Sequence, residues 1–505
     1  MILRIFSKDL PLHNLIFVIG EGVLIYTVIL ISAFLIYDTG GFSFLTREIL
    51  AGALLIMVVC QTSLYLNDLY NLAVTDSYME IARRLTRAMG IASIALAIIY
   101  HCIPSLVIGH GVVAIIIVIL ILLGLCWRYV YKFVLKKMMF TEGVLLIGSG
   151  ELCQKILDAV NDRRDCGYKM LGLIYTNSTS ALTVRCEIPV YKVNENLSQL
   201  AKSLKAKKII VAVDQRRGSL PMRELLRCRM RGIKIVEAGS FYEKLTGKIL
   251  VEKIHPSWFI FSDGFRTSKH ACFLKRFFDV VLAGLGLICI SPLAGIIALA
   301  IKLDSAGPVI FKQERCGKGE RTFNLHKFRS MIHNAEKQCG PVWSHENDWR
   351  VTRVGRILRK YRLDEIPQMW NVLKGDMSFV GPRPERPEFV QKLKEIIPYY
   401  PERHNVKPGI TGWAQISYGY GASVEDALEK LEYDLFYIKN ISVLMDLMIV
   451  LRTIKVVLRN DSTGQSSFGQ ERGQGEKTSE ICESMANSAS AGTQGKHKHT
   501  MEHPI

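Results

Sequence analysis

Long apolar runs alternate with short basic segments over the first 140 residues of the chain. The apolar runs cover residues 14–37, 49–66, 88–108 and 112–131, close to the length that a helix needs to cross a bilayer. Lys and Arg gather before the first run, between the second and third, and after the fourth, whereas the other two connections carry only Arg47. Because basic loops stay cytoplasmic, this pattern predicts a four-helix transmembrane bundle over residues 1–140 with both ends in the cytoplasm. Glu21, the one charge in the first run, suits either an intramembrane function or helix packing.

The pattern changes after Gly143, where "GVLLIGSGELCQKILDAV" indicates an apolar strand, a glycine turn and an amphipathic helix. Three further strand-like runs, "MLGLIY", "KIIVAV" and "IKIVEA", predict a Rossmann-like α/β domain with a parallel sheet over residues 141–255. Gly148 and Gly150 begin a dinucleotide fingerprint, but Cys153 stands at its third glycine position and no acidic residue follows the next strand. A tight structural turn is therefore favoured, and a nucleotide or regulatory ligand stays open.

A fifth apolar run, between Lys275 and Ser305, is interrupted by Ser291 and Pro292. Basic residues flank both of its ends, and Pro292 removes a helix hydrogen bond. We therefore expect a re-entrant helical hairpin over residues 275–303 that enters and leaves the membrane on one face. The Ser291 hydroxyl is placed to satisfy a carbonyl that the proline frees.

Composition narrows the class of partner. The net charge of +18 permits nucleic acid, anionic lipid or phosphate-bearing substrates, and 49% hydrophobic residues fit a membrane protein. The 12 cysteines form no metal-binding spacing, so neither a disulfide framework nor a structural zinc site is expected. No recognisable nucleic-acid-binding motif is present, which argues against nucleic acid.

Basic residues and glycines fill the segment after the fifth apolar run. Lys327 and Arg329 fall on a strand of a hairpin that follows a Gly317 to Gly319 turn. More basic residues follow in the same region: Arg353, Arg356, Arg359, Lys360, Arg362, Arg383, Arg386, Arg403 and Lys407. The planar fork of arginine suits phosphate oxygens, so we interpret the segment as a phosphate-binding region.

Two adjacent carboxylates, Asp364 and Glu365, lie among these bases in "RKYRLDEIPQMWNVLKGDMSFVGPRPE". One interpretation is structural, with Asp364 capping a helix over about residues 365–373 and Pro367 in its first turn. The other is catalytic, because a carboxylate inside an anion-attracting pocket suits a divalent cation or attack on phosphorus. Residue types alone do not choose between the two.

The order and spacing of several motifs between residues 271 and 460 resemble the bacterial sugar transferase family, the polyprenyl-phosphate phosphoglycosyl transferases. The motifs are "KRFFDVV", "SPLAGIIALAIKLDSAGPVIFKQERCGKGERTFNLHKFRSM", "RLDEIPQMWNVLKGDMSFVGPRPE" and "VKPGITGWAQ". The preceding bundle and Rossmann-like domain resemble the large monotopic members that initiate exopolysaccharide or capsule synthesis. The resemblance implies a catalytic α/β domain over 271–460 with the re-entrant helix, a linker over 256–270 that includes "WFIFSDGF", and a disordered tail over 461–505.

The resemblance further implies that Asp364 is a nucleophile, assisted by Glu365. It would attack a UDP-sugar, release UMP and form a covalent phosphosugar ester, which undecaprenyl phosphate would then take. Mg²⁺ is the implied cofactor, with Asp364 as a ligand and Asp434 as a weaker candidate. The implied substrate-binding residues are Lys327, Arg329, Arg359, Arg383 and Arg403, and Ser291 and Pro292 match the helix break of the family.

Hexose, with glucose favoured, is the expected sugar, and the bacterial inner membrane with a cytoplasmic catalytic face is the expected location. The bilayer and downstream glycosyltransferases of the same pathway are expected partners, and a homo-oligomer stays open. Two other functions compete with this one: nucleotide-sugar oxidoreduction in the Rossmann-like domain, and a non-catalytic membrane scaffold for polysaccharide export.

Overall fold

The computed structural model describes the chain with several gaps. Described are residues 2–5, 8–37, 47–70, 78–104, 112–136, 141–162, 166–175, 188–192, 197–212, 220–253, 259, 262, 264–265, 269–332, 348, 350–419, 421 and 423–459. The chain divides into two units, residues 1–464 and 465–505. The predicted tail at 461–505 and most of the predicted linker at 256–270 lie outside the described residues.

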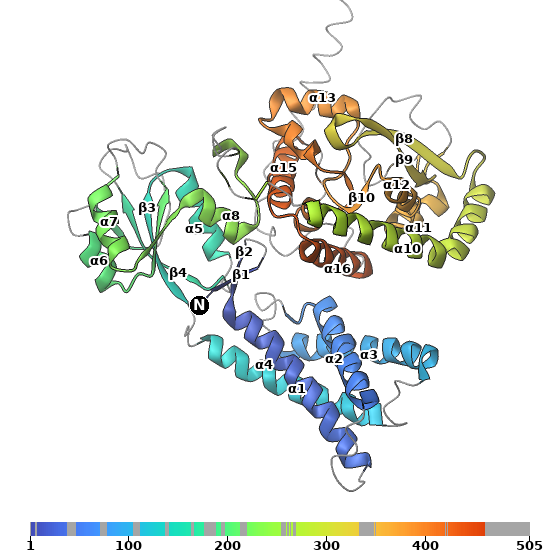
Figure 1. The fold of residues 1–505 in the computed structure, drawn as a ribbon, viewed down its shortest axis with the longest axis horizontal. Coiled ribbons are helices and arrows are strands. Elements are labelled where there is room, and N and C mark those ends of the chain that lie inside the picture. The colour runs from blue at the N-terminus through green and yellow to red at the C-terminus, as the bar shows by residue number, and fades with distance from the viewer. Residues whose placement is uncertain are drawn as a thin grey trace, which may run out of the picture. The chain divides into compact units, whose positions relative to one another are not determined.

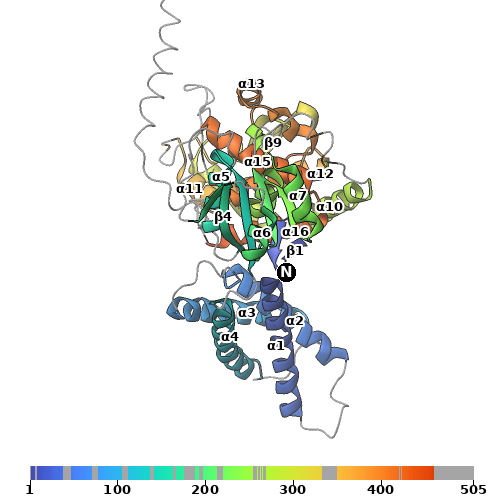
Figure 2. The same cartoon turned by 90° about the vertical axis from the view of Figure 1, so that its left-hand side faces the viewer.

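Four helices follow a short antiparallel hairpin of β1 (Ile2–Ile5) and β2 (Lys8–Pro11). They are α1 (Leu12–Tyr37), α2 (Arg47–Leu66), α3 (Tyr78–Cys102) and α4 (Val112–Lys136). Helices α1 and α3 each contact both α2 and α4, which closes the group into a bundle (Figures 1 and 2). The apolar faces meet in a common core that includes Ile29, Ile56, Leu85 and Leu96.

The predicted apolar runs are confirmed as helices. Among the described residues, α1, α2 and α3 of the bundle and the later helix Lys269–Asp304 are long and apolar enough to cross a bilayer, and Ile117–Val130 of α4 is a shorter apolar segment. Helix α3 begins about ten residues before the predicted run, because an amphipathic turn precedes its apolar part. In that turn Arg84 Nε donates to Glu80 Oε1 at 2.6 Å. The chain is therefore a membrane protein.

Glu21 is buried in the bundle and forms an ion pair with Arg128, which joins α1 to α4. The Arg128 guanidinium also lies 5.7 Å from the centre of the Phe17 ring. Because the pair links two helices within the bundle core, this geometry favours the packing role for Glu21 over an independent function.

The α/β domain has a five-stranded, all-parallel sheet in the order β5-β4-β3-β6-β7. Its strands are β3 (Glu142–Gly148), β4 (Tyr168–Tyr175), β5 (Val190–Lys192), β6 (Lys208–Ala212) and β7 (Lys234–Glu237). Helices α5 (Glu151–Asn161) and α8 (Ala238–Thr246) cover one face, and α6 (Leu197–Ser203) and α7 (Met222–Met230) cover the other (Figure 1). The predicted parallel Rossmann-like sheet is confirmed.

The glycine turn after β3 has a structural explanation. A Cβ on Gly148 would lie 2.1 Å from the Ala212 carbonyl oxygen, and Gly148 has a φ of +140°. Cys153, at the third position of the fingerprint, is buried in the core under the sheet. The turn therefore needs glycine for close backbone approach whether or not a ligand binds, as the structural interpretation expects.

The third region begins with α10 (Lys269–Asp304) and β8 (Ile310–Cys316), a 3₁₀ turn η4 (Lys318–Glu320) and β9 (Thr322–Phe328). After these come α11 (Arg353–Lys360), the 3₁₀ turn η5 (Leu363–Glu365), α12 (Gln368–Lys374), β10 (Ser378–Val380), α13 (Pro387–Ile396), the 3₁₀ segment η6 (Tyr400–Asn405), β11 (Gly409–Thr411), α14 (Trp413–Ser417), α15 (Val424–Lys439) and α16 (Val443–Arg459). Strands β8 and β9 pair antiparallel, and β10 and β11 pair parallel. Buried side chains of α13, α15 and α16 form the largest core of this region.

Helix α10 carries the fifth apolar run as one 36-residue helix with Pro292 inside it. The Ser291 hydroxyl donates to the Ile288 carbonyl at 2.8 Å, one turn before the proline. In Figure 1 the ribbon of α10 changes direction along its length, as expected of a helix that contains proline. Most large apolar side chains in its middle are exposed, so the helix presents an apolar surface suited to lipid.

Candidate active site

The two carboxylates lie in η5, between α11 and α12. Arg362 precedes them in a left-handed backbone conformation with a φ of 56°, which is uncommon for a residue with a side chain. The predicted helix cap is wrong, because α12 begins only at Gln368 with Pro367 at its N-cap, and no side chain caps it. Asp364 instead belongs to the tight 3₁₀ turn, so the capping interpretation does not account for it.

Glu365 collects the basic side chains of the site. Its Oε1 accepts from Lys327 Nζ at 3.2 Å and from Arg383 Nη2 at 3.0 Å, and Arg362 Nη1 lies 3.7 Å away. Burial opposes ionisation of this carboxyl, but the three cations outweigh it and hold the pKa of Glu365 well below its usual range. Glu365 is therefore an ionised carboxylate that keeps a lysine and an arginine in place.

Asp364 is buried beside this cluster, yet its Oδ1 has no hydrogen-bond partner. Burial raises the pKa of Asp364, the neighbouring Glu365 raises it further, and Lys327 and Arg359 oppose both effects. The sequence interpretation assumed that the basic field serves Asp364, whereas the direct ion pairs go to Glu365. Asp364 thus combines an available oxygen with a position beside cations, as a nucleophile or metal ligand requires.

Lys327 reaches the site from β9, opposite Phe311 of β8. Burial lowers the pKa of Lys327, while Glu365 opposes the shift. Asn371 of α12 is fully buried and fixes this strand against the helix: its Oδ1 accepts from His326 N at 3.0 Å and its Nδ2 donates to Asn324 O at 2.8 Å. Sequence reasoning missed Asn371, although a polar amide between the apolar residues Trp370 and Val372 was a usable signal.

Arg383 follows β10 on the turn "GPRP". Its Nη1 donates to Gln415 Oε1 at 3.0 Å, while its other terminal nitrogen binds Glu365. The turn is held backbone to backbone, since a Cβ on Gly409 would lie 2.1 Å from Gly381 N and one on Gly412 would lie 2.2 Å from Gly381 O. Gly409 and Gly412 therefore serve close backbone packing against the Arg383 turn. Gln415 was also missed by the sequence analysis.

Arg359 reaches the site from α11, where its Nε donates to Ser330 Oγ at 2.9 Å. Helix α11 can press against the end of β9 because Gly355 has no side chain; a Cβ there would lie 2.0 Å from Ser330 O. Arg359 also acts electrostatically on Asp364. Its guanidinium keeps terminal nitrogens for which the described residues supply no partner, as expected of a phosphate-binding arginine.

Arg329 has a different role from the one expected. The side chain is buried, and it donates to Pro308 O at 2.6 Å, Ser305 O at 2.6 Å and Ser305 Oγ at 2.9 Å. These acceptors lie at and just beyond the C-terminal end of α10, where free carbonyls and the helix dipole favour a cation. Arg329 therefore anchors the end of α10, and we do not include it among the phosphate-binding residues.

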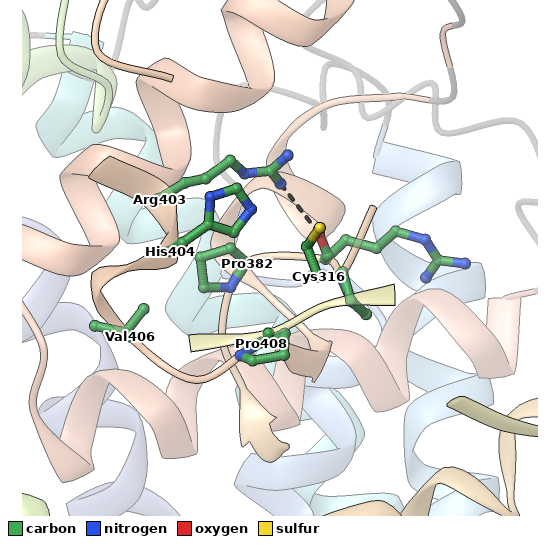
Figure 3. Close-up of a pocket in the computed structure, with 9 residues that line it drawn as sticks. Cys316, Pro382, Arg403, His404, Val406 and Pro408 are labelled. Carbon is green, nitrogen blue, oxygen red and sulfur yellow. Dashed lines mark hydrogen bonds between the residues drawn. The ribbon is translucent and has the colours of Figure 1, made fainter. Parts of the chain in front are cut away.

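Arg403 and Asp434 form a buried pair, with Arg403 Nη2 at 2.9 Å from Asp434 Oδ2. Burial raises the pKa of Asp434 to about 6, although Arg403 opposes the shift. Arg403 also donates to the Arg383 carbonyl at 3.1 Å, the dashed line in Figure 3, where it lies with His404 and Pro382 around a small, solvent-open hollow. The pair holds the Arg383 turn from behind, which favours a supporting role for both residues over direct contact with phosphate or metal.

The residues present fit a Mg²⁺ ion held jointly with a diphosphate. Within the described ranges no group of three or more His, Cys, Asp or Glu side chains is arranged to hold a metal. Mg²⁺ needs no such cage, because it is usually bound through one or two carboxylates, substrate phosphates and water. The unpartnered Oδ1 of Asp364 is a suitable ligand, whereas Asp434 is occupied by Arg403.

These features define a membrane protein whose catalytic region places a buried carboxylate beside a cluster of basic side chains suited to bind phosphate. Comparison with known proteins agrees. The family model described as "Bacterial sugar transferase" matches residues 270–460, and the one described as "CoA-binding domain" matches residues 65–224. The second match runs from the transmembrane helices into the parallel α/β domain.

Three relatives illustrate the first match. The chain is 44% identical over 236 residues to UDP-N-acetylgalactosamine-undecaprenyl-phosphate N-acetylgalactosaminephosphotransferase of Aeromonas hydrophila, covering 47% of this chain and 55% of the relative. It is 48% identical over 185 residues to UDP-glucose:undecaprenyl-phosphate glucose-1-phosphate transferase of Escherichia coli, covering 36% and 39%. It is 40% identical over 186 residues to exopolysaccharide production protein PSS of Rhizobium leguminosarum bv. phaseoli, covering 36% and 93%.

The chain belongs to the bacterial sugar transferase family. This assignment rests on the catalytic region, residues 270–460. The chain spans about half the length of the Aeromonas relative and less of the Escherichia relative.

Proposed function

We propose that the chain is a phosphoglycosyl transferase that moves a sugar 1-phosphate from a UDP-sugar to undecaprenyl phosphate. The observation that carries this proposal is the contrast within the carboxylate pair: Glu365 is bound by Lys327 and Arg383, while Asp364 keeps a buried oxygen without a partner. A carboxylate in this position is suited to attack phosphorus, and the neighbouring cations are suited to the charge that develops on the phosphoryl oxygens.

The reaction follows as two displacements at one phosphorus. Asp364 forms a bond from its carboxylate oxygen to the sugar-bearing phosphorus, and the bond from that phosphorus to the bridging oxygen breaks, releasing UMP. An oxygen of undecaprenyl phosphate then attacks the same phosphorus, and the bond to Asp364 breaks, which regenerates the carboxylate. Lys327, Arg359 and Arg383 bind oxygens of the reacting phosphoryl group in both steps. Mg²⁺, held by Asp364 and the diphosphate, would neutralise phosphate charge.

The proposed sugar is a hexose. Glucose remains the first choice, and N-acetylgalactosamine is the second because the Aeromonas relative, which shares the longer match, carries that sugar in its name. Downstream glycosyltransferases would then extend the lipid-linked sugar into an exopolysaccharide or capsule.

The two ends of α10 support the re-entrant hairpin. Near its start, Arg276 donates to Val372 O at 2.6 Å, and near its end, Asp304 accepts from Val354 N at 3.0 Å. Both partners belong to the same catalytic region, so both ends of α10 lie beside it. A straight 36-residue helix would extend about 54 Å, which exceeds a bilayer core of about 30 Å. Both contacts can form if α10 enters and leaves the membrane on one face. We propose that this is the cytoplasmic face of the inner membrane, where nucleotide sugars occur.

The deciding experiment uses the full chain in lipid nanodiscs with Mg²⁺ and either UDP-glucose or UDP-N-acetylgalactosamine. Intact-protein mass spectrometry follows the adduct without acceptor, and UMP release follows turnover with undecaprenyl phosphate. We expect a phosphosugar adduct in the wild type and none in Asp364→Asn, with turnover reduced by orders of magnitude. Full turnover by Asp364→Asn would contradict the proposal.

The hairpin has its own test. Single cysteines placed on either side of Ser291 and Pro292, in a background without exposed cysteines, are labelled in oriented vesicles by a membrane-impermeant thiol reagent. We expect positions near Lys275 and Lys302 to react from the same side. Labelling of these two positions from opposite sides would establish a straight span instead.

A further inference from the structure

The first part of α10 carries a polar cluster that the proposed chemistry does not use. Asp279 follows Arg276 by three residues and Lys275 by four, spacings that place each pair on one side of the helix. Asp279 is only 6% exposed, which is unusual for a carboxylate at the start of an apolar helix. If these charges served only to keep this end of the helix at the membrane surface, Asp279 would be exposed to solvent. Its burial therefore indicates another role.

Asp279 binds the strand that leads to the active-site arginine. Its Oδ1 accepts from Phe379 N at 2.9 Å and from Ser378 Oγ at 3.1 Å. Both donors belong to β10, whose last residue is Val380. A carboxylate that receives a main-chain and a hydroxyl donor fixes the strand in both position and orientation.

Lys275 holds the next residue of the same strand. Its Nζ donates to Val380 O at 3.0 Å and lies 2.6 Å from Asp446 Oδ2. The Tyr437 hydroxyl completes the cluster, at 3.1 Å from Val380 O and 2.8 Å from Asp446 Oδ1. Two donors, Lys275 from α10 and Tyr437 from α15, thus converge on the Val380 carbonyl, and Asp446 of α16 binds both of them. This carbonyl lies two positions before Pro382, which precedes Arg383.

The turn after β10 transmits this placement to the site. Gly381 N donates to Thr411 O at 2.9 Å, and Gly409 N donates to Pro382 O at 2.9 Å, so the backbone between Val380 and Arg383 has little freedom to compensate for a shift. Arg383 itself reaches Glu365 at 3.0 Å. A displacement of β10 by a fraction of an ångström would therefore lengthen that contact.

We propose that Asp279, supported by Lys275, is a positioning residue that sets Arg383 against Glu365 from the membrane helix. The inference rests on the phosphosugar transfer proposed above. It means that α10 anchors the catalytic region in lipid and also aligns the cationic side of the active site.

The test uses the full chain in nanodiscs and three graded variants. Asp279→Ala removes both accepted hydrogen bonds, Ser378→Ala removes one donor, and Asp279→Asn keeps an oxygen acceptor at the same place. Lys394→Ala serves as a matched control, because it removes an ion pair with Glu320 at 3.2 Å, away from β10. Adduct formation is measured with whichever of UDP-glucose and UDP-N-acetylgalactosamine the wild type accepts, alone and in an Arg383→Ala background.

We expect Asp279→Ala to slow adduct formation by about tenfold or more, Ser378→Ala by less, and Asp279→Asn by no more than about threefold. In the Arg383→Ala background, Asp279→Ala should add less than about threefold, because its effect runs through the missing arginine. The inference would be overturned if the double variant lost adduct formation by the product of the two single losses. It would also be overturned if Asp279→Asn formed the adduct as slowly as Asp279→Ala.

Hydrogen–deuterium exchange provides a readout that needs no turnover. Residues 378–383 should exchange faster in Asp279→Ala than in the wild type, and Lys394→Ala should leave this segment unchanged. Exchange at the wild-type rate in Asp279→Ala would refute the positioning role. A wild type without adduct or turnover would refute the proposed function, while the exchange measurement would still decide whether Asp279 holds the Arg383 turn.

Discussion

Arg383 and Glu365 meet at 3.0 Å between Nη2 and Oε1, and this contact separates the roles of the two adjacent carboxylates. Because Glu365 satisfies the arginine and Lys327, Asp364 is left with a buried oxygen that no side chain or backbone group occupies. The pair is therefore asymmetric before any substrate binds. One carboxylate organises cations, and the other is available for chemistry.

Replacing Arg383 by lysine should not preserve function. The guanidinium binds Glu365 and Gln415 with two different nitrogens, whereas an ammonium group is a single compact charge that cannot span both. We expect Arg383→Lys to lower kcat/KM for the UDP-sugar by about tenfold or more, and Gln415→Ala to lower it by a smaller factor. Steady-state kinetics of UMP release would check this. Near-normal kinetics in Arg383→Lys would exclude a role for the two-nitrogen binding by the guanidinium.

The acid limb of the pH profile should report Asp364. Attack requires the ionised form, and burial together with Glu365 raises the pKa of Asp364. Activity should therefore fall with decreasing pH at a value above the ordinary aspartate pKa of about 3.9. Glu365→Gln removes the neighbouring negative charge, so the same limb of kcat/KM should move to lower pH. A limb that stays in place in Glu365→Gln would assign it to another group.

Arg329 and Arg359 provide a matched pair of arginines with opposite expected effects. Arg329 binds carbonyls at the end of α10, so Arg329→Ala should lower the free energy of unfolding by about 2 to 4 kcal/mol while KM for the UDP-sugar stays unchanged. Arg359→Ala should raise KM by about tenfold with little change in stability. Thermal unfolding and kinetics of both variants would check the assignment. A raised KM in a stable Arg329→Ala would return this residue to the substrate-binding set.

The Glu21–Arg128 pair should behave as a buried ion pair in the bundle. Glu21→Leu or Arg128→Met alone leaves one charge without its partner and should destabilise the bundle by about 3 to 5 kcal/mol, whereas the double variant should recover most of that loss. Denaturant titration of the protein in detergent, followed by tryptophan fluorescence, measures the change. If all three variants were as stable as the wild type, the pair would contribute nothing to packing.

The sequence predicted the elements whose information is local. The apolar runs of the bundle and the strand–turn–helix after Gly143 follow from periodicity and length, and both are found. A cluster of basic residues near Asp364 was also expected, because the family resemblance places Lys327, Arg359 and Arg383 in its site. Which bases face the carboxylates was not, because β9 ends at Phe328 and the path of the chain beyond the strand decides what Arg329 meets. Lys327 reaches Glu365, whereas Arg329, two residues later, reaches the end of α10.

The helix cap at Asp364 failed for a related reason. Residue preferences favour Asp before a helix, but the left-handed Arg362 and the 3₁₀ turn place α12 three residues further on. Asn371, Gln415 and Asp279 were missed because each acts on a strand or turn far away in the sequence. Single-residue chemistry could suggest them only as polar side chains in apolar or glycine-rich surroundings.

The contacts of α10 also bear on how the enzyme can be prepared. Arg276 covers two carbonyls at the end of α12, and Asp279 covers a main-chain amide of β10, so the helix completes hydrogen bonds inside the catalytic region. A truncated protein that starts after Asp304 would leave those groups without partners beside the site. A water-soluble catalytic fragment is therefore the wrong reagent for inhibitor screening, and the target should be purified with its membrane segment in place.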